Sequence, residues 1–95
     1  AEAAGAFGLL VEGVPSAAGA AVTAAVGIPT IGIGAGPGCD GQVLVWHDVL
    51  GLLSDFRPKF VKRYAESGEV IRAALAGYCR EVKAGTFPGP EHGFK

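Results

Sequence analysis

One glutamate, Glu12, directly follows an apolar run, Phe7 to Val11, whose composition is typical of a strand buried on both faces. In α/β folds the carboxyl ends of parallel strands carry the functional sites, so Glu12 is placed where a carboxylate could do chemistry. In a partly dry site it would suit the role of general base. Position alone fits equally well with a solvated carboxylate near the start of the next helix.

Two further polar residues, His47 and Asp48, end a third apolar run, Gln42 to Trp46. At the end of a strand they could serve in acid/base or hydrogen-bonding work near Glu12. A structural histidine followed by a helix-capping or loop carboxylate is the simpler interpretation, and it is favoured. Trp46 is expected in the core.

The stretch "GPGCDG", Gly36 to Gly41, fits the G-x-G-x-x-G spacing of dinucleotide-binding loops. In that fingerprint the third glycine opens a helix, whereas the β-rich "QVLVWHD" follows here, so nucleotide binding is not favoured. Gly32, Gly34 and Gly36 instead predict a strand whose small residues widen the mouth of a site for a ligand.

The remaining polar residues have simple structural explanations. Asp40 precedes Gly41 in an apparent Asp-Gly turn, where local hydrogen bonds account for the carboxylate. Glu91 and His92 stand together in the glycine- and proline-rich tail, and two residues do not make a metal site. None of the three is expected to do chemistry.

The elements that must position Glu12 follow in the order β-α-β-β and then helices. Apolar and turn patterns predict strands, a crossover helix and two later helices at these places: strands 7–11, 29–36 and 42–46, the crossover helix 16–26, and helices 58–65 and 69–84. In the last helix one apolar stripe comprises Val70, Ile71, Ala74, Leu75, Tyr78 and Val82.

Strands joined by a helix should be parallel with a right-handed crossover, and three of them cannot bury both faces alone. An eight-stranded parallel barrel needs about 250 residues. Residues 1–95 are therefore predicted to be the C-terminal third of a (β/α)8 barrel, with its last three strands and terminal helices. The N-terminal part of that single domain would lie outside this chain, which agrees with the absence of methionine.

The charge balance and the cysteine content limit the classes of partner and the cellular setting that are expected. Eight basic residues against nine acidic ones give a formal net charge of -1, which predicts no nucleic acid and no anionic membrane as partner. The opening residues lack a basic signal-peptide region, and no apolar run is long enough for a membrane span. Two widely spaced cysteines, Cys39 and Cys79, fit a reduced cytoplasmic setting.

Four stretches run in order through the chain: "AGAFGLLVEGVP", "IPTIGIGAGPGCDGQVLVWHD", "KFVKRYAE" and "GTFPGPEHGF". Together they resemble the C-terminal part of the ketopantoate hydroxymethyltransferase family. The resemblance implies a (β/α)8 barrel, commonly a homodecamer, in the pantothenate and coenzyme A pathway. It implies transfer of a one-carbon unit from 5,10-methylenetetrahydrofolate to 3-methyl-2-oxobutanoate, which gives 2-dehydropantoate and tetrahydrofolate.

The resemblance also implies a role for Glu12, because the glutamate of the family's "E.VP" motif is its proton acceptor. A divalent ion, usually Mg2+, would hold the oxo acid and stabilise its enolate. The family's metal ligands, its serine and aspartate substrate contacts and its lysine belong to earlier strands, so no metal ligand or cofactor-binding residue transfers to this chain. Gly13 stands where a larger residue is common, which implies a roomier surrounding for the base.

Two alternatives stay open. One is a non-catalytic assembly or regulatory module that keeps this barrel segment, and the other is a relative in the pyruvate and phosphoenolpyruvate barrel group that uses Mg2+ and an oxo acid without folate. Acidic ligands at the ends of upstream strands would favour an enzyme. The 95 residues alone are expected to be inactive and poorly stable, because they leave strand edges and an apolar face open.

Overall fold

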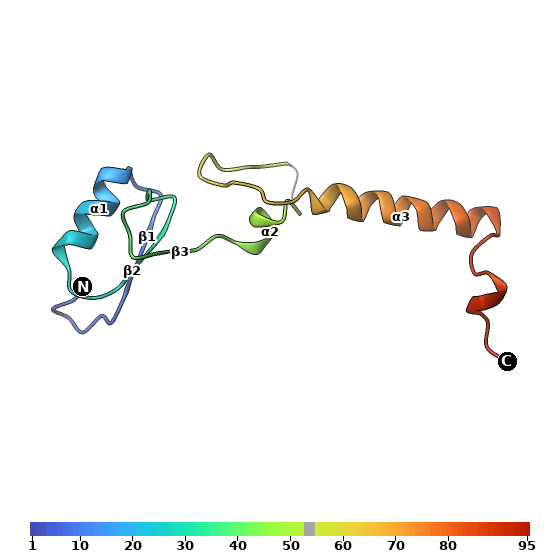
Figure 1. The fold of residues 1–95 in the computed structure, drawn as a ribbon, viewed down its shortest axis with the longest axis horizontal. Coiled ribbons are helices and arrows are strands. Elements are labelled where there is room, and N and C mark those ends of the chain that lie inside the picture. Colours follow the sequence, from blue (N-terminus) through green and yellow to red (C-terminus); the bar gives the residue numbers. More distant parts are fainter. Residues whose placement is uncertain (53–54) are drawn as a thin grey trace.

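The computed structural model describes residues 1–52 and 55–95 and has a mixed α/β architecture with a small parallel sheet (Figure 1). Its elements follow one another in this order: β1 (Leu9–Glu12), α1 (Ser16–Ala25), β2 (Thr30–Ile33), β3 (Gly41–Gln42), α2 (Trp46–Val49), α3 (Ser67–Ala84) and a 3-10 helix η1 (Pro90–His92).

The three strands lie in the order β1-β2-β3, and both neighbouring pairs are parallel. Leu9 pairs with Thr30 and Glu12 with Ile33, so β1 and β2 run side by side over their full length. Helix α1 is the crossover between them, as parallel pairing requires. The predicted β-α-β unit with parallel strands is therefore confirmed.

Helix α1 covers one face of this sheet, and a small polar network ties it there. The hydroxyl of Thr30 is fully buried and lies 2.8 Å from the hydroxyl of Thr23 on α1, which in turn donates to the Gly19 carbonyl. The Asp40 carboxylate accepts a hydrogen bond from the Thr30 amide (2.9 Å), and the Asp40 amide donates to the Thr30 hydroxyl (3.1 Å). The start of β2 is thus joined to α1 and to the loop before β3.

The opposite face of the sheet is open, which differs from the expectation of strands buried on both faces. Leu10 is 64% exposed and Ile31 37% exposed, and they line an apolar hollow of about 620 Å³ with Phe7, Pro29 and Val43. The difference has a simple cause, because α1 is bonded to the other face through Thr23 and Thr30, and the side chains of Leu10 and Ile31 remain exposed among the described residues.

The third strand is shorter than predicted, and Trp46 begins α2 instead of ending a strand. Beyond the Val43 amide, which donates to the Gly32 carbonyl, the chain has no neighbouring strand, because β2 ends at Ile33 and Gly34 turns away with φ +64°. Trp46 is 61% exposed in the described part of the chain, so its expected place in the core is not seen there.

The helix predicted over 58–65 is wrong, since these residues form a turn and extended segments. The amide of Val61 donates to the Pro58 carbonyl, and that of Tyr64 donates across to the Val49 carbonyl (2.8 Å). Backbone donors that a helix would use internally therefore bond within a turn or to the last residue of α2. We call residues 55–65 the return segment.

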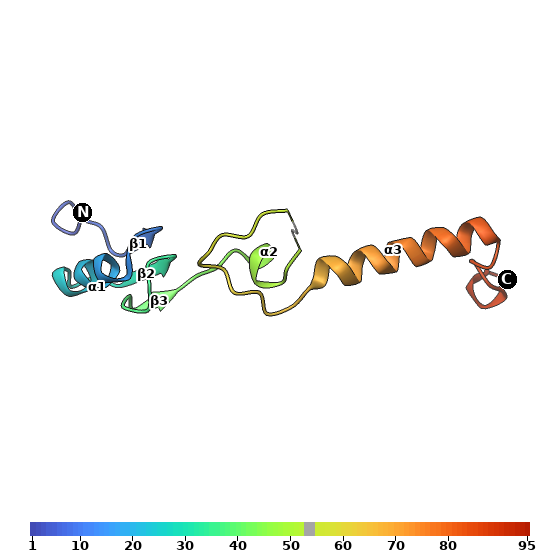
Figure 2. The ribbon, with the colours of Figure 1, turned by 90° about the horizontal axis from the view of Figure 1, so that it is seen from above.

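The predicted last helix is confirmed as α3, which begins two residues earlier than expected and ends at Gly85 with φ +77°. In two perpendicular views it extends away from the sheet (Figures 1 and 2). Its apolar stripe is accordingly exposed. The Cα radius of gyration is 22.0 Å, compared with about 12 Å for a compact domain of this length.

Candidate functional site

Glu12 lies at the carboxyl end of β1, where the sequence placed it. The ladder continues past it, because the Gly13 amide donates to the Ile33 carbonyl (2.9 Å) and the Val14 amide to the Gly34 carbonyl (3.0 Å). Gly13 has φ +65°, a conformation that favours glycine, and there the chain turns toward α1. The Glu12 side chain is exposed, and by strand alternation it shares the open face with Leu10.

The surroundings of Gly13 are spacious. A Cβ atom at this position would meet no heavy atom within 4 Å. The space next to Gly13 is therefore open among the described residues. A roomier surrounding for the base stays a prediction for the complete protein.

The return segment covers the carboxyl ends of β1 and β2. The ring of Phe60 packs on Gly34, where a Cβ would lie 2.7 Å from its Cδ2 atom. Ser16, at the start of α1, packs in the same way on Gly36, which has φ +78°. These glycines were expected to widen the mouth for a ligand, but their space is taken by side chains of the chain itself.

An open cavity of about 540 Å³ lies beside Glu12. It is lined by residues 13–16 after β1, by Gly34 and Gly36 after β2, and by Lys59 and Phe60 of the return segment. Phe60 also borders a second hollow of about 470 Å³, which Asp40 and Gln42 line as well. The phenyl ring therefore separates two hollows along the carboxyl edge of the sheet.

Lys59 is the functional candidate that the sequence did not reveal. Its side chain is exposed, and it is the one charged residue that lines the cavity beside Glu12. In the sequence it stands within the run that was assigned to a helix, far from Glu12. The "PKF" stretch offers a proline and an aromatic residue as turn and packing signals, but neither identifies Gly34 as the contact.

His47 and Asp48 lie in α2 and not at the end of a strand. The His47 ring stacks at a tilt on Trp46, with 4.4 Å between ring centroids. Helix α2 lies beyond the sheet in both views, on the side of α3 (Figures 1 and 2). The structure therefore does not bring these residues to Glu12, and the structural interpretation of His47 fits better.

The other polar residues also have structural surroundings. Asp40 is held by Thr30 as described above, and Gly41 opens β3, so the glycine motif is not followed by a helix. In η1 the Nδ1 atom of His92 accepts a hydrogen bond from the Gly89 amide (3.0 Å) and lies 3.5 Å from Glu91. The C-terminal segment that contains η1 lies beyond α3, at the end of the molecule away from the sheet (Figure 1).

The described residues do not fit a metal centre by themselves. Within residues 1–52 and 55–95, no three side chains of the His, Cys, Asp or Glu type gather into a group that could hold an ion. Both cysteines are free thiols. Any metal near Glu12 would need ligands from outside this chain.

Comparison with known proteins identifies the family. The family model described as ketopantoate hydroxymethyltransferase matches residues 1–90. This chain belongs to that family. The ketopantoate hydroxymethyltransferase resemblance of the four quoted stretches is thereby confirmed.

Curated relatives of this chain bear the name 3-methyl-2-oxobutanoate hydroxymethyltransferase, which denotes an enzyme. The protein of Syntrophobacter fumaroxidans is 63% identical over 91 residues, covering 96% of this chain and 32% of the relative. That of Pelobacter propionicus is 59% identical over 93 residues, covering 98% and 35%. That of Paracoccus denitrificans is 62% identical over 91 residues, covering 96% and 33%.

The chain thus spans about a third of the length of the curated relatives it matches. Two thirds of each relative has no counterpart in it. Among the helices of the described residues, none has the length and apolar character that crossing a membrane requires.

Proposed function

We propose that the complete polypeptide carrying this chain is a 3-methyl-2-oxobutanoate hydroxymethyltransferase in which Glu12 is the general base. It would transfer a one-carbon unit from 5,10-methylenetetrahydrofolate to 3-methyl-2-oxobutanoate and release 2-dehydropantoate and tetrahydrofolate. The observation that carries this proposal is the position of Glu12, in the motif "EGVP" of a family member, at the carboxyl end of a parallel strand beside an open cavity.

The proposed work of Glu12 is a proton transfer. Its carboxylate takes the proton from the carbon next to the keto group, and the electron pair of the broken C–H bond moves into the carbonyl to form an enolate. That carbon then forms a bond to the one-carbon unit, whose two C–N bonds to the folate break. Water supplies the oxygen of the new hydroxymethyl group and the two protons that the folate nitrogens take up, and the alkoxide takes up the proton that the carbon lost. Because Glu12 is exposed on the open face and its neighbour is a glycine, a small oxo acid can approach the carboxylate without displacing a side chain.

Mg2+ is proposed as the ion of the complete protein. Bound there, it would supply positive charge for the oxygen of the enolate. The described residues do not assemble a group of three ligands, so the ligands are expected in the part of the polypeptide outside this chain.

The architecture of the complete protein is proposed to be a (β/α)8 barrel that includes residues 1–95 as its C-terminal third, assembled as a homodecamer in the cytoplasm. Support for the barrel comes from the parallel β1-α1-β2 unit and from the open apolar face of the sheet, which the side chains of further strands can cover. The homodecamer and the cytoplasmic location rest on the family resemblance and on the two cysteines, respectively. Glu12 would then face the barrel mouth together with the ends of the other strands.

The test is Glu12→Gln in the complete protein, with Glu69→Gln on the exposed part of α3 as a matched control. The amide keeps the shape of the side chain but cannot accept the proton. We expect a loss of turnover of about 10²- to 10⁴-fold, typical for a general base, with an unchanged fold by circular dichroism. The exchange of the oxo-acid proton with solvent should fall equally, while the control keeps both activities.

Near-normal turnover of the Glu12→Gln protein would refute the assignment of the base. The family membership favours the transferase over a non-catalytic module and over an oxo-acid enzyme without folate. A complete protein that exchanges the proton but never accepts methylenetetrahydrofolate would support the second of these alternatives.

A further inference from the structure

We propose that Lys59 binds a carboxylate of the one-carbon donor in the cavity beside Glu12, and that the contact of Phe60 with Gly34 positions it there. The inference rests on the proposed function, because it assumes methylenetetrahydrofolate as the donor. It adds a donor-binding residue from the return segment to a site in which Glu12 acts on the acceptor.

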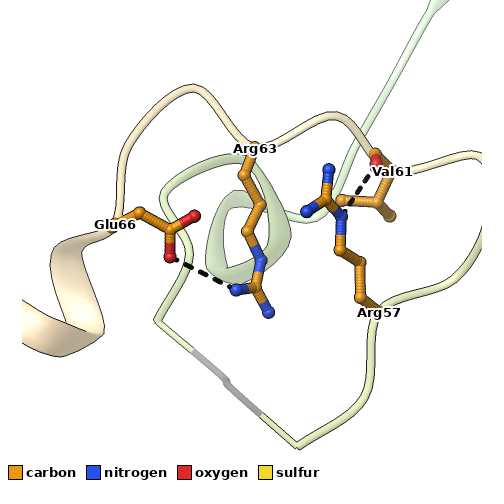
Figure 3. Close-up of polar contacts among 4 residues, drawn as sticks. All are labelled: Arg57, Val61, Arg63 and Glu66. Carbon is orange, nitrogen blue, oxygen red and sulfur yellow. Dashed lines mark hydrogen bonds and ion pairs between the residues drawn. The ribbon is translucent and has the colours of Figure 1, made fainter.

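The place of Lys59 is set by its neighbours in the chain. Phe60 is anchored on Gly34, and Val61 is one of the three buried apolar residues of the described chain. Behind them, Nε of Arg57 donates to the Val61 carbonyl (3.4 Å), and Arg63 forms an ion pair with Glu66 (3.3 Å), as Figure 3 shows. The Tyr64 amide ties the end of the segment to Val49.

Lys59 forms no ion pair within the described residues. In the part of the chain that the structure describes, no acidic side chain lies within 4 Å of its ammonium group as an ion pair, and none lines the cavity. Ser16, which also lines the cavity, is the first residue of α1, and this helix end has no side-chain cap. The partial positive charge of the helix N-terminus adds to the positive potential of the cavity. The cavity therefore suits an anionic group.

Both substrates carry carboxylates, and the greater length of the donor favours it as the ligand of Lys59. The small oxo acid must place its reacting carbon at Glu12, on the open face of the sheet. The donor brings one carbon to that same atom and is much longer, so the rest of it must extend into neighbouring space. The cavity beyond Gly13 is such a space, and Lys59 lines it. The ammonium group of Lys59 can bind the carboxylate in the tail of a folate.

The experiment uses the complete protein with Lys59→Glu, Lys59→Gln and Lys59→Arg. The matched control is Lys62→Glu, a lysine of the same segment whose ammonium lies 4.9 Å from the ring centroid of Tyr64 and outside the cavity lining. We expect Lys59→Glu to raise the KM for methylenetetrahydrofolate about five- to tenfold, and Lys59→Gln about two- to fivefold. The arginine variant should stay within about twofold of the parent.

Three readouts separate donor binding from other roles. The KM for 3-methyl-2-oxobutanoate and its proton exchange without folate should be unchanged in all Lys59 variants. The donor effect should grow with the number of glutamates on the folate and shrink in high salt. Tetrahydrofolate binding, measured by calorimetry, should weaken by the same factor as the KM rises.

An unchanged donor KM in Lys59→Glu would overturn the proposal, and so would an equal rise in the KM for the oxo acid, which would assign Lys59 to the acceptor. An effect of the same size in Lys62→Glu would mean that the change in donor KM comes from general surface charge, and this result would also overturn the proposal. Failure of the proposed function has a different signature, because proton exchange would then persist in Glu12→Gln whatever Lys59 does.

Discussion

The ring of Phe60 lies directly against Gly34, and this contact joins the return segment to the end of β2. Gly34 meets two requirements at once, because its φ of +64° favours glycine and any Cβ would approach Cδ2 of the ring to 2.7 Å. Because residue 34 has no β-carbon, the ring of Phe60 has room to pack against it. This packing holds the segment that carries Lys59 at the carboxyl edge of the sheet.

Replacing Gly34 by alanine should loosen this contact. The positive φ alone costs an L-residue about 1 to 2 kcal/mol, and the clash with Phe60 adds about 1 to 3 kcal/mol. We expect the Gly34→Ala protein to lose more free energy of unfolding in urea than Gly85→Ala, which has a similar φ of +77° and no atom within 4 Å of the added Cβ. Equal losses in the two variants would mean that the ring does not constrain position 34.

The same variant should expose the return segment to proteolysis. With Phe60 displaced, trypsin should cut after Lys59 and Lys62 faster in the Gly34→Ala protein than in the parent. The cleavage rate in native buffer, followed by mass spectrometry, checks this. Unchanged rates would show that Val61 and the Tyr64 amide hold the segment without the ring.

Removing the buried hydroxyl of Thr30 should destabilise the sheet. Valine keeps the shape of Thr30 but leaves the Asp40 amide and the Thr23 hydroxyl without this partner. The expected loss in the free energy of unfolding is about 1 to 3 kcal/mol. Thr86→Val, at an exposed position after α3, is the control and should cost less than about 0.5 kcal/mol. A Thr30→Val protein as stable as the parent would contradict the importance of this network.

A substitution on the open face of the sheet can test the proposed barrel. Leu10 is largely exposed in the described chain but should be buried by other strands in the complete protein. Leu10→Ala should then cost about 2 to 5 kcal/mol in chemical denaturation of the complete protein, as for a core leucine. A change below about 0.5 kcal/mol would place this face in solvent and argue against closure of a barrel over it.

The parts of the fold that could be predicted are those whose signals are local. The apolar run before Glu12, the alanine-rich helix α1 and the β-branched start of β2 each follow from neighbouring residues, and α3 follows from its length and period. The position of Glu12 at a strand end came from the same local pattern. These elements need no knowledge of distant contacts.

The wrong predictions concern residues whose conformation depends on contacts with distant parts of the sequence. Apolar residues in 58–65 suggested a helical period, but their backbone bonds to Val49 and their side chains fill space beside Gly34. The third strand stops early because its partner β2 turns away at that glycine. For the same reason Lys59 could not be found from the sequence, since its place in the lining of the cavity after β1 depends on the packing of Phe60 on Gly34.

The bond between Thr30 and Asp40 has a consequence for strand alignment. Strand β3 has only two residues, so its ladder with β2 resists sliding weakly. The Asp40 carboxylate and amide both form hydrogen bonds with Thr30. These two bonds fix the register of β3 against β2, in which Gly41 pairs with Ile31. A slip by one residue would reverse which face each β3 side chain occupies and would pull the Gln42 amide from the Gly36 carbonyl, 2.9 Å away. The amide and the hydroxyl of Thr30 together therefore hold the shortest strand in its register.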